Sequence, residues 1–186
     1  MRIDPTSSRP LAFIGPSGCG KSALLAELAR RGLIQVTPTW TDRPRRSGES
    51  ELEHRFVDVA TFDKLAAAGT FAEVVQPFGL PHRYGMAPLE AETGLLVVVM
   101  VRAPFVARLR EYYPGTVVYQ LEASPEFARA SVEARGDTEV GTRLSGFEAE
   151  IAQGRALADR VFTNSGQDLN SLADEVMRAL RSDGLL

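Results

Sequence analysis

Short apolar runs alternate along the chain with segments in which apolar residues recur at helical spacing. Four segments have the composition of strands, namely residues 11–14, 95–101, 117–121 and 160–163. The second is apolar throughout, which is usual for a parallel strand that is covered on both faces. Strands that alternate with helices predict an α/β fold, in which helices cover both faces of an open parallel sheet.

Helices are expected between and after these strands. The expected helices cover residues 23–31, begin near Pro104, begin near Pro125, and cover residues 169–180. Proline suits the first position of a helix, and Ser124 is the expected N-cap of the helix that begins near Pro125. Gly32 is well placed to end the first helix as its C-cap.

Two polar stretches interrupt this alternation, at residues 37–88 and 135–146. The first is dense in charge, glycine and proline, and the second is polar and contains glycine. We expect a single domain, 1–186, because the chain has neither repeats nor a linker and is too short for two ordinary domains. Its core would comprise residues 9–36, 89–134 and 147–186, with the two stretches as excursions.

Composition narrows the classes of partner. The net charge of −3 argues against a general nucleic-acid binder, which usually carries a broad basic surface. The apolar run at 95–101 is far below the roughly 20 residues that span a bilayer, so no membrane partner is expected. Cys19 is the single cysteine, which indicates a reducing cytoplasm. This thiol is either a small space-filling group or, beside Lys21, a redox-sensitive one.

The most specific motif is GPSGCGKS, from Gly15 to Ser22, which lies between the first strand and the first helix. This order predicts a phosphate-binding P-loop, whereas a glycine-rich turn matching by chance is the alternative. Lys21 would reach the outer phosphates of ATP, and the Ser22 hydroxyl would coordinate Mg²⁺. The residues expected to bind ATP here are Gly15, Pro16, Ser17, Gly18, Cys19, Gly20, Lys21, Ser22 and Ala23.

A second basic motif lies in the first polar stretch, where Arg43, Arg45 and Arg46 fall within four positions. Arginine suits phosphate because its planar fork donates two parallel hydrogen bonds. The loop could therefore hold a second phosphorylated molecule that faces the triphosphate. The alternative is a solvated loop whose arginines pair with the glutamates at 49, 51 and 53.

The P-loop, the stretch TDRPRRSGE, the segment FAEV with Glu73 and the segment RYG with Tyr84 follow the order seen in guanylate kinases. The chain resembles this family over most of its length. The resemblance implies a P-loop NTPase fold with a five-stranded parallel sheet flanked by helices. It also implies that residues 37–88 form a small region that binds a nucleoside monophosphate, and that residues 135–146 form a short lid.

The resemblance further assigns roles to individual residues. It implies that Arg43, Arg46 and Tyr84 hold the phosphate of the acceptor, GMP, and that Glu73 and Thr39 contact the guanine. Arg135 and Arg143 would neutralise the phosphoryl group in transfer, together with Lys21 and Arg43, and Asn164 would lie near the adenine. A carboxylate fits guanine because it accepts from two adjacent N–H donors. From the residues alone, Glu73 could equally be an exposed carboxylate and Tyr84 a packing aromatic.

The chain also departs from the family pattern. Val99 and Val101 stand where guanylate kinases carry aspartates, and His54 stands where they carry a tyrosine that binds the acceptor phosphate. Asp42 is one candidate for a replacement Mg²⁺ carboxylate, and without one turnover is expected to be slow. These departures, with the pair Arg102–Ala103, resemble ribose 1,5-bisphosphate phosphokinases. Three hypotheses stay open: a GMP kinase, a ribose 1,5-bisphosphate phosphokinase, and a guanylate-kinase-like binding module that has lost catalysis.

Overall fold

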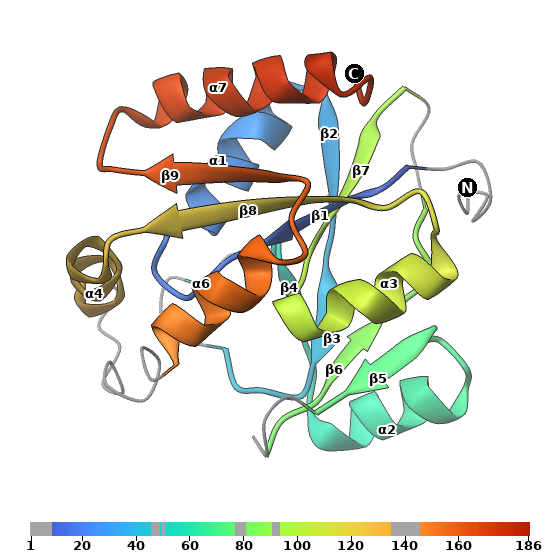
Figure 1. The fold of residues 1–186 in the computed structure, drawn as a ribbon. Coiled ribbons are helices and arrows are strands. Elements are labelled where there is room, and N and C mark those ends of the chain that lie inside the picture. Colours follow the sequence, from blue (N-terminus) through green and yellow to red (C-terminus); the bar gives the residue numbers. More distant parts are fainter. Residues whose placement is uncertain (1–8, 46–48, 50, 77–80, 91–93, 135–145) are drawn as a thin grey trace.

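The protein is described by a computed structural model that covers residues 9–45, 49, 51–76, 81–90, 94–134 and 146–186. Its centre is a parallel sheet of five strands in the order β2-β7-β1-β8-β9 (Figure 1). These strands are β1 (Leu11–Ile14), β2 (Ile34–Thr37), β7 (Leu96–Met100), β8 (Val117–Ala123) and β9 (Arg160–Asn164). The predicted α/β fold with a five-stranded parallel sheet is confirmed.

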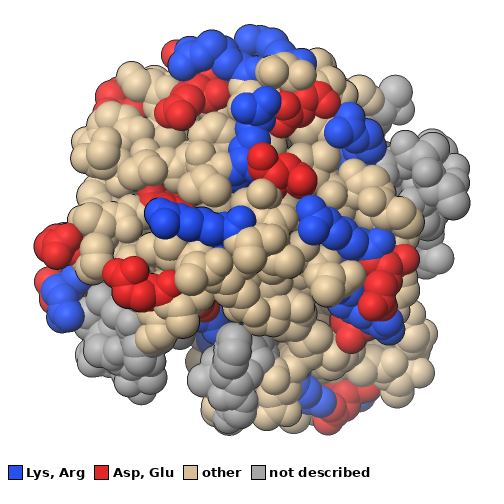
Figure 2. All heavy atoms as spheres, viewed as in Figure 1, with Lys and Arg blue, Asp and Glu red and all other residues tan. Residues whose placement is uncertain are grey.

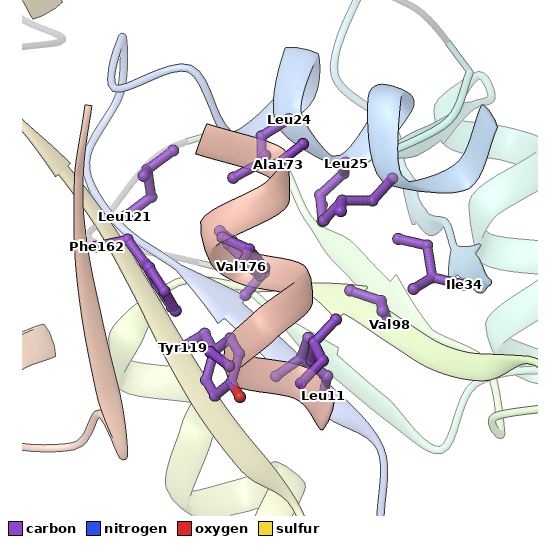
Figure 3. Packing of buried hydrophobic residues seen from close by; sticks show 14 of the residues in the cluster. Leu11, Leu24, Leu25, Ile34, Val98, Tyr119, Leu121, Phe162, Ala173 and Val176 are labelled. Atoms are coloured by element: carbon purple, nitrogen blue, oxygen red, sulfur yellow. The ribbon is translucent and has the colours of Figure 1, made fainter. Parts of the chain in front are cut away.

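Helices cover both faces of this sheet. Successive side chains along each strand point to opposite faces, and the apolar residues on each face are buried by helices. The helices are α1 (Lys21–Arg30), α3 (Val106–Tyr112), α4 (Pro125–Glu133), α6 (Phe147–Arg155) and α7 (Leu169–Ser182), with the short 3-10 helix η2 (Ala103–Phe105) before α3. On one face α1 and α7 pack on Leu11, Val98 and Tyr119 (Figure 3). On the other face Val106 and Leu109 of α3 pack on Val97 and Val99.

Capping residues, glycine and proline in the sequence predicted where several of these helices begin and end. Ser124 caps α4, since its hydroxyl oxygen accepts a hydrogen bond from the Phe127 amide at 3.1 Å. Gly32 follows the end of α1 with φ +74°, as expected of a residue just past a helix. The helix expected near Pro104 begins with η2 and becomes α3 at Val106, because proline is accommodated in the first turn.

A second, mixed sheet lies in the first polar stretch and is called here the small sheet. It has the order β4-β3-β6-β5, with β3 (Thr39–Thr41), β4 (His54–Phe56), β5 (Glu73–Val75) and β6 (Tyr84–Met86), and it is accompanied by α2 (Val59–Ala67). Phe71 packs on Phe62 of α2 and on Trp40 of β3, with ring centroids 4.9 Å and 6.3 Å away. These aromatic contacts hold α2 against one face of the small sheet, below it in Figure 1.

Basic and acidic side chains are interspersed on the face of the molecule that Figure 2 shows. On the face shown in Figure 2, most lysine and arginine side chains lie beside an aspartate or glutamate. Within the described part of the chain, no helix is both long and apolar enough to span a membrane.

Candidate functional site

The glycine-rich loop leads from the carboxyl end of β1 into the first turn of α1. Gly20 occupies the N-cap position with φ +96°, and in the described residues no side chain caps this helix. The first turn of α1 also contains no acidic residue. The amide groups and the positive end of the helix dipole are therefore free of a competing carboxylate, which suits them to phosphate.

Close packing of this loop against the sheet explains two of its glycines. A Cβ atom on Gly15 would lie 2.1 Å from the carbonyl oxygen of Leu121 in β8. A Cβ atom on Gly18 would lie 2.4 Å from the carbonyl oxygen of Ala128 in α4. The loop thus takes its shape from backbone-to-backbone contact that any larger residue would disrupt.

Lys21 is folded back over the loop that precedes it. Its Nζ donates hydrogen bonds to the carbonyl oxygens of Gly15 and Pro16, each at 2.8 Å, and lies 3.6 Å from the Cys19 sulfur. An ammonium group held by neutral carbonyls can turn to a phosphate without breaking an ion pair. Cys19 itself is fully buried, which favours its space-filling role over the redox-sensitive one.

Asn164, at the end of β9, braces the same loop. Its side-chain amide donates to the carbonyl oxygen of Cys19 at 3.0 Å and accepts from the Gly166 amide at 3.1 Å. A Cβ atom on Gly20 would lie only 2.7 Å from the side-chain nitrogen of Asn164. Asn164 therefore holds the loop in shape, and its contact with adenine stays a prediction.

Four of the residues predicted to bind the acceptor, Thr39, His54, Glu73 and Tyr84, lie on one face of the small sheet. Thr39 pairs with His54 across β3 and β4, and Glu73 pairs with Met86 across β5 and β6. Since Trp40 pairs with Gly85, Thr39 lies opposite Met86, so that His54, Thr39, Met86 and Glu73 form one row across the sheet. Alternation along the strands puts Phe56, Thr41 and Tyr84 on the same face. This face is turned away from α2 and its aromatic contacts.

His54 is the centre of the contacts on this face. Its Nδ1 lies 2.8 Å from the Thr39 hydroxyl, and its ring centroid lies 5.5 Å from that of Tyr84. The sequence predicted all three residues as acceptor contacts from separate segments of the chain. The small sheet brings them within reach of a single ligand.

Arg43 follows β3 and is buried, with 7% of its surface exposed. Its two terminal nitrogens donate to the two carboxylate oxygens of Glu49 at 2.9 Å and 2.8 Å, and its guanidinium lies 5.2 Å from the Phe56 ring centroid. Its Nε is buried without a hydrogen-bond partner among the described residues. Burial opposes the charge, but Glu49 and the nearby Tyr84 raise the pKa of Arg43 above its usual value. Arg46, its predicted companion, lies outside the described residues.

Asp42 is not available as a magnesium ligand in this arrangement. Its carboxylate accepts hydrogen bonds at 2.7 Å from the backbone amide and from the Nε of Arg83. Burial alone would raise the pKa of Asp42, but these bonds lower it below the usual range. Arg83 also pairs with Asp63 of α2, so Asp42 serves to tie β3 to the segment before β6 and to α2.

Glu73 is held from the core side of the molecule. Arg108 of α3 donates from its Nε to the Glu73 carboxylate at 2.8 Å. Sequence reasoning missed Arg108, since it lies on a helix 35 residues further along the chain and belongs to no motif.

The end of β7 carries no carboxylate. Val99 is fully buried between β1 and α3, Val101 is partly buried, and the next residue, Arg102, pairs with Glu150 of α6. In the described segments no group of three or more histidines, cysteines, aspartates or glutamates could hold a metal ion. Arg135 and Arg143, which were expected to belong to a lid, lie outside the described residues.

The chain was compared with known proteins by sequence and by structure. No family model matches the chain. A guanylate kinase of Chromohalobacter salexigens is 32% identical over 148 residues, which cover 76% of this chain and 69% of that protein. A ribose 1,5-bisphosphate phosphokinase PhnN of Janthinobacterium is 31% identical over 70% of this chain, but the match spans only 29% of that protein's length.

The fold agrees with the first of these relatives. The crystal structure of guanylate kinase from Anaplasma phagocytophilum superposes on 95% of this chain and 86% of its own with a TM-score of 0.64, at 23% identity. The fold likeness rests on structure, and the family assignment rests on the sequence identity over two thirds of a curated relative. The chain belongs to the guanylate kinase family.

Proposed function

We propose that the protein transfers the γ-phosphoryl group of ATP to the phosphate of GMP, which yields GDP and ADP. The observation that carries this proposal is the small-sheet face, where a buried arginine, a histidine, a tyrosine and a carboxylate gather beside a P-loop fold. These are the groups that a nucleotide with one phosphate and a guanine base requires. Membership of the guanylate kinase family supports the same reaction.

The donor site would be the P-loop. Backbone amides of Gly15–Ser22 and the start of α1 would hold the phosphates of ATP, while Lys21 turns from its two carbonyls to the outer phosphates. Magnesium, when bound, would neutralise charge on the transferred group. Ser22, the second residue of α1, is the protein ligand that we assign to it, with water and phosphate oxygens completing the coordination.

The acceptor phosphate would bind at Arg43. The buried Nε of Arg43 has no hydrogen-bond partner among the described residues, and a phosphate oxygen would satisfy this donor. Glu49 holds the opposite edge of the guanidinium, so the group is already oriented for the ligand. Tyr84 and His54 would complete this phosphate site from β6 and β4, and Arg46 would add a second charge.

The guanine would lie along the row that ends in Glu73. Glu73 would accept from the N–H donors of the base, and Thr39 would contact it from the neighbouring strand. We assign residues 37–88 to acceptor binding and residues 135–146 to a lid whose Arg135 and Arg143 stabilise the transferred group. Closure of both excursions would exclude water, which otherwise competes with GMP for the phosphoryl group.

A coupled assay of ADP release tests this reaction directly. The protein is incubated with ATP and Mg²⁺ and with GMP, AMP or ribose 1,5-bisphosphate as acceptor. We expect turnover with GMP and a rise in melting temperature on adding GMP, because binding to the native state stabilises it. Binding of ATP without turnover of any acceptor would favour a binding module and contradict the proposal.

Ribose 1,5-bisphosphate is the second candidate acceptor. It is favoured by the match to the PhnN protein and by the end of β7, which offers Val99, Val101 and a positive Arg102 in place of carboxylates. Turnover of this sugar phosphate together with inactivity on GMP would establish the second candidate. Under that outcome Glu73→Gln, which removes the proposed guanine contact, would leave the rate unchanged.

A further inference from the structure

Two contacts from the core helix α3 reach the start of the small-sheet strand β5, one at its first residue, Glu73, and one at Ala72 just before it (Figure 1). Arg108 donates from its Nε to the Oε2 atom of Glu73 at 2.8 Å. The Tyr112 hydroxyl donates to the carbonyl oxygen of Ala72 at 2.7 Å. The proposed base-reading carboxylate is therefore positioned by a helix that belongs to the core.

The Arg108 side chain, although about half exposed, has a partner for each of its guanidinium nitrogens. One terminal nitrogen pairs with Glu111, the other lies 3.3 Å from the Tyr112 hydroxyl, and the guanidinium carbon lies 5.0 Å from the Tyr112 ring centroid. The hydrogen bonds to Glu73 and then to Glu111 raise the pKa of Arg108 above its usual value. With all three nitrogens engaged, the side chain directs its Nε at Glu73.

Guanine offers more hydrogen-bond donors than Glu73 has oxygens that Arg108 does not engage. Guanine presents two adjacent donors, the ring N1–H and the 2-amino group, and pairing both in full requires both oxygens of a carboxylate. Arg108 already engages Oε2, and an oxygen in an ion pair is a weaker acceptor for a second donor. The neighbour of Glu73 in the row is Met86, so the row supplies no other carboxylate for the 2-amino group.

Resting on the proposed function, we propose that Arg108 is a positioning residue for Glu73 that sets the specificity of the acceptor site. It fixes the carboxylate in place and leaves mainly the Oε1 atom to read the base. The site then recognises the N1–H of a 6-oxopurine strongly and its 2-amino group weakly. The wild-type protein should accordingly accept IMP, which lacks the 2-amino group, alongside GMP.

The ratio of kcat/KM for GMP to kcat/KM for IMP tests this assignment, with ATP and Mg²⁺ at saturating concentration. We expect a wild-type ratio of about tenfold or less, because one charge-assisted hydrogen bond is weakened. Arg108→Gln frees Oε2, and we expect it to increase the ratio by about tenfold. A ratio of two substrates on one preparation is independent of the fraction of folded protein, so a purely structural role would not change it.

Two further variants make the comparison specific. Arg110→Gln removes the other arginine of α3, which contacts Asp159 and the Leu157 carbonyl and not Glu73, and it should keep the wild-type ratio. Arg108→Lys keeps a cation beside Glu73 and should change the ratio less than Arg108→Gln. An unchanged ratio in Arg108→Gln, with GMP still turned over, would overturn the assignment of Arg108 alone. Wild-type protein that binds ATP but phosphorylates neither nucleotide would overturn the proposed function and this inference with it.

Discussion

The donor side and the acceptor side of the molecule are held in place by different kinds of contact. The P-loop is shaped by its backbone, with Gly15 and Gly18 pressed against carbonyl oxygens of β8 and α4. The small-sheet face is shaped by ion pairs between side chains, such as Arg43 with Glu49 and Glu73 with Arg108. Geometry fixed by backbone contact resists substitution, whereas geometry fixed by ion pairs can be retuned one residue at a time.

This difference also determines what each side must give up on binding its ligand. Lys21 leaves two neutral carbonyl oxygens when it turns to the phosphates. Arg43 and Glu73 each already have a charged partner, so the acceptor must share them with Glu49 and Arg108. Donor binding therefore depends on the P-loop motif, while the choice of acceptor depends on Glu49 and Arg108, which lie outside the P-loop.

Lys21→Ala is expected to have the largest effect. It removes the charge that we assign to the outer phosphates, and turnover should fall by about a thousandfold. The matched control is Lys64→Ala on the exposed side of α2, the other lysine of the chain, which should keep wild-type turnover. Steady-state rates of ADP release with GMP compare the three proteins, and equal losses in both variants would contradict the donor assignment.

Gly18→Ala tests the backbone packing of the donor side. Both Gly18 and Gly32 have positive φ angles, +83° and +74°, but only a Cβ on Gly18 meets backbone atoms, since nothing lies within 4 Å of one on Gly32. Gly32→Ala should therefore cost about 1 kcal/mol for the left-handed conformation alone. Gly18→Ala adds a steric clash and should cost about 3 kcal/mol in total.

Unfolding in urea, with and without ATP, measures these two changes. Stabilisation by ATP should persist in Gly32→Ala and be lost in Gly18→Ala, because the second substitution deforms the phosphate-binding loop. If the two variants were equally stable, the contact with Ala128 would not shape the loop.

The fold was more predictable from the sequence than the acceptor site, because local rules determine the first and contacts between distant segments determine the second. Apolar periodicity, Ser124 and Gly32 mark the core because local rules place strands, caps and helix ends. The strand β2 and the helices α2 and α6 were not expected from the sequence, because tertiary packing decides whether such short elements form. No local rule could join Arg108 to Glu73, or Asp42 to Arg83, because such pairs depend on how distant segments fold together.

Arg43→Gln tests the acceptor side. It removes the charge and the buried Nε donor, and the KM for GMP should rise by about thirtyfold, or about 2 kcal/mol, with the KM for ATP unchanged. Arg45→Gln is the control, because Arg45 is half exposed and pairs with the exposed Glu51. A parallel rise of both KM values in Arg43→Gln would mean that the substitution disturbs the fold and not the acceptor phosphate alone.

Asp183→Asn is expected to have the smallest effect, on stability and not on either site. Asp183 joins the end of α7 to the core sheet, accepting from Arg160 of β9 and from the Tyr119 hydroxyl of β8 at 2.6 Å each. The Arg160 hydrogen bond, followed by that of Tyr119, lowers the pKa of Asp183 to about 2, although partial burial opposes this shift. A carboxylate with a lowered pKa stabilises the fold above its unfolded pKa, and this contribution is lost as the pH falls through the folded value.

The asparagine variant should therefore be about 1 kcal/mol less stable than the wild type near neutral pH, and the difference should shrink between about pH 4 and pH 2. Asp174→Asn is the matched control, because Asp174 pairs with Arg31 at an exposed position where an ion pair contributes little. Free energies of unfolding in urea across this pH range compare the three proteins. A constant difference between Asp183→Asn and the wild type would show that packing, and not the ionised carboxylate, accounts for the loss. Turnover per folded molecule should be unchanged. This ion pair lies where β9 begins, whereas the P-loop follows the other, carboxyl end of the parallel strand β1.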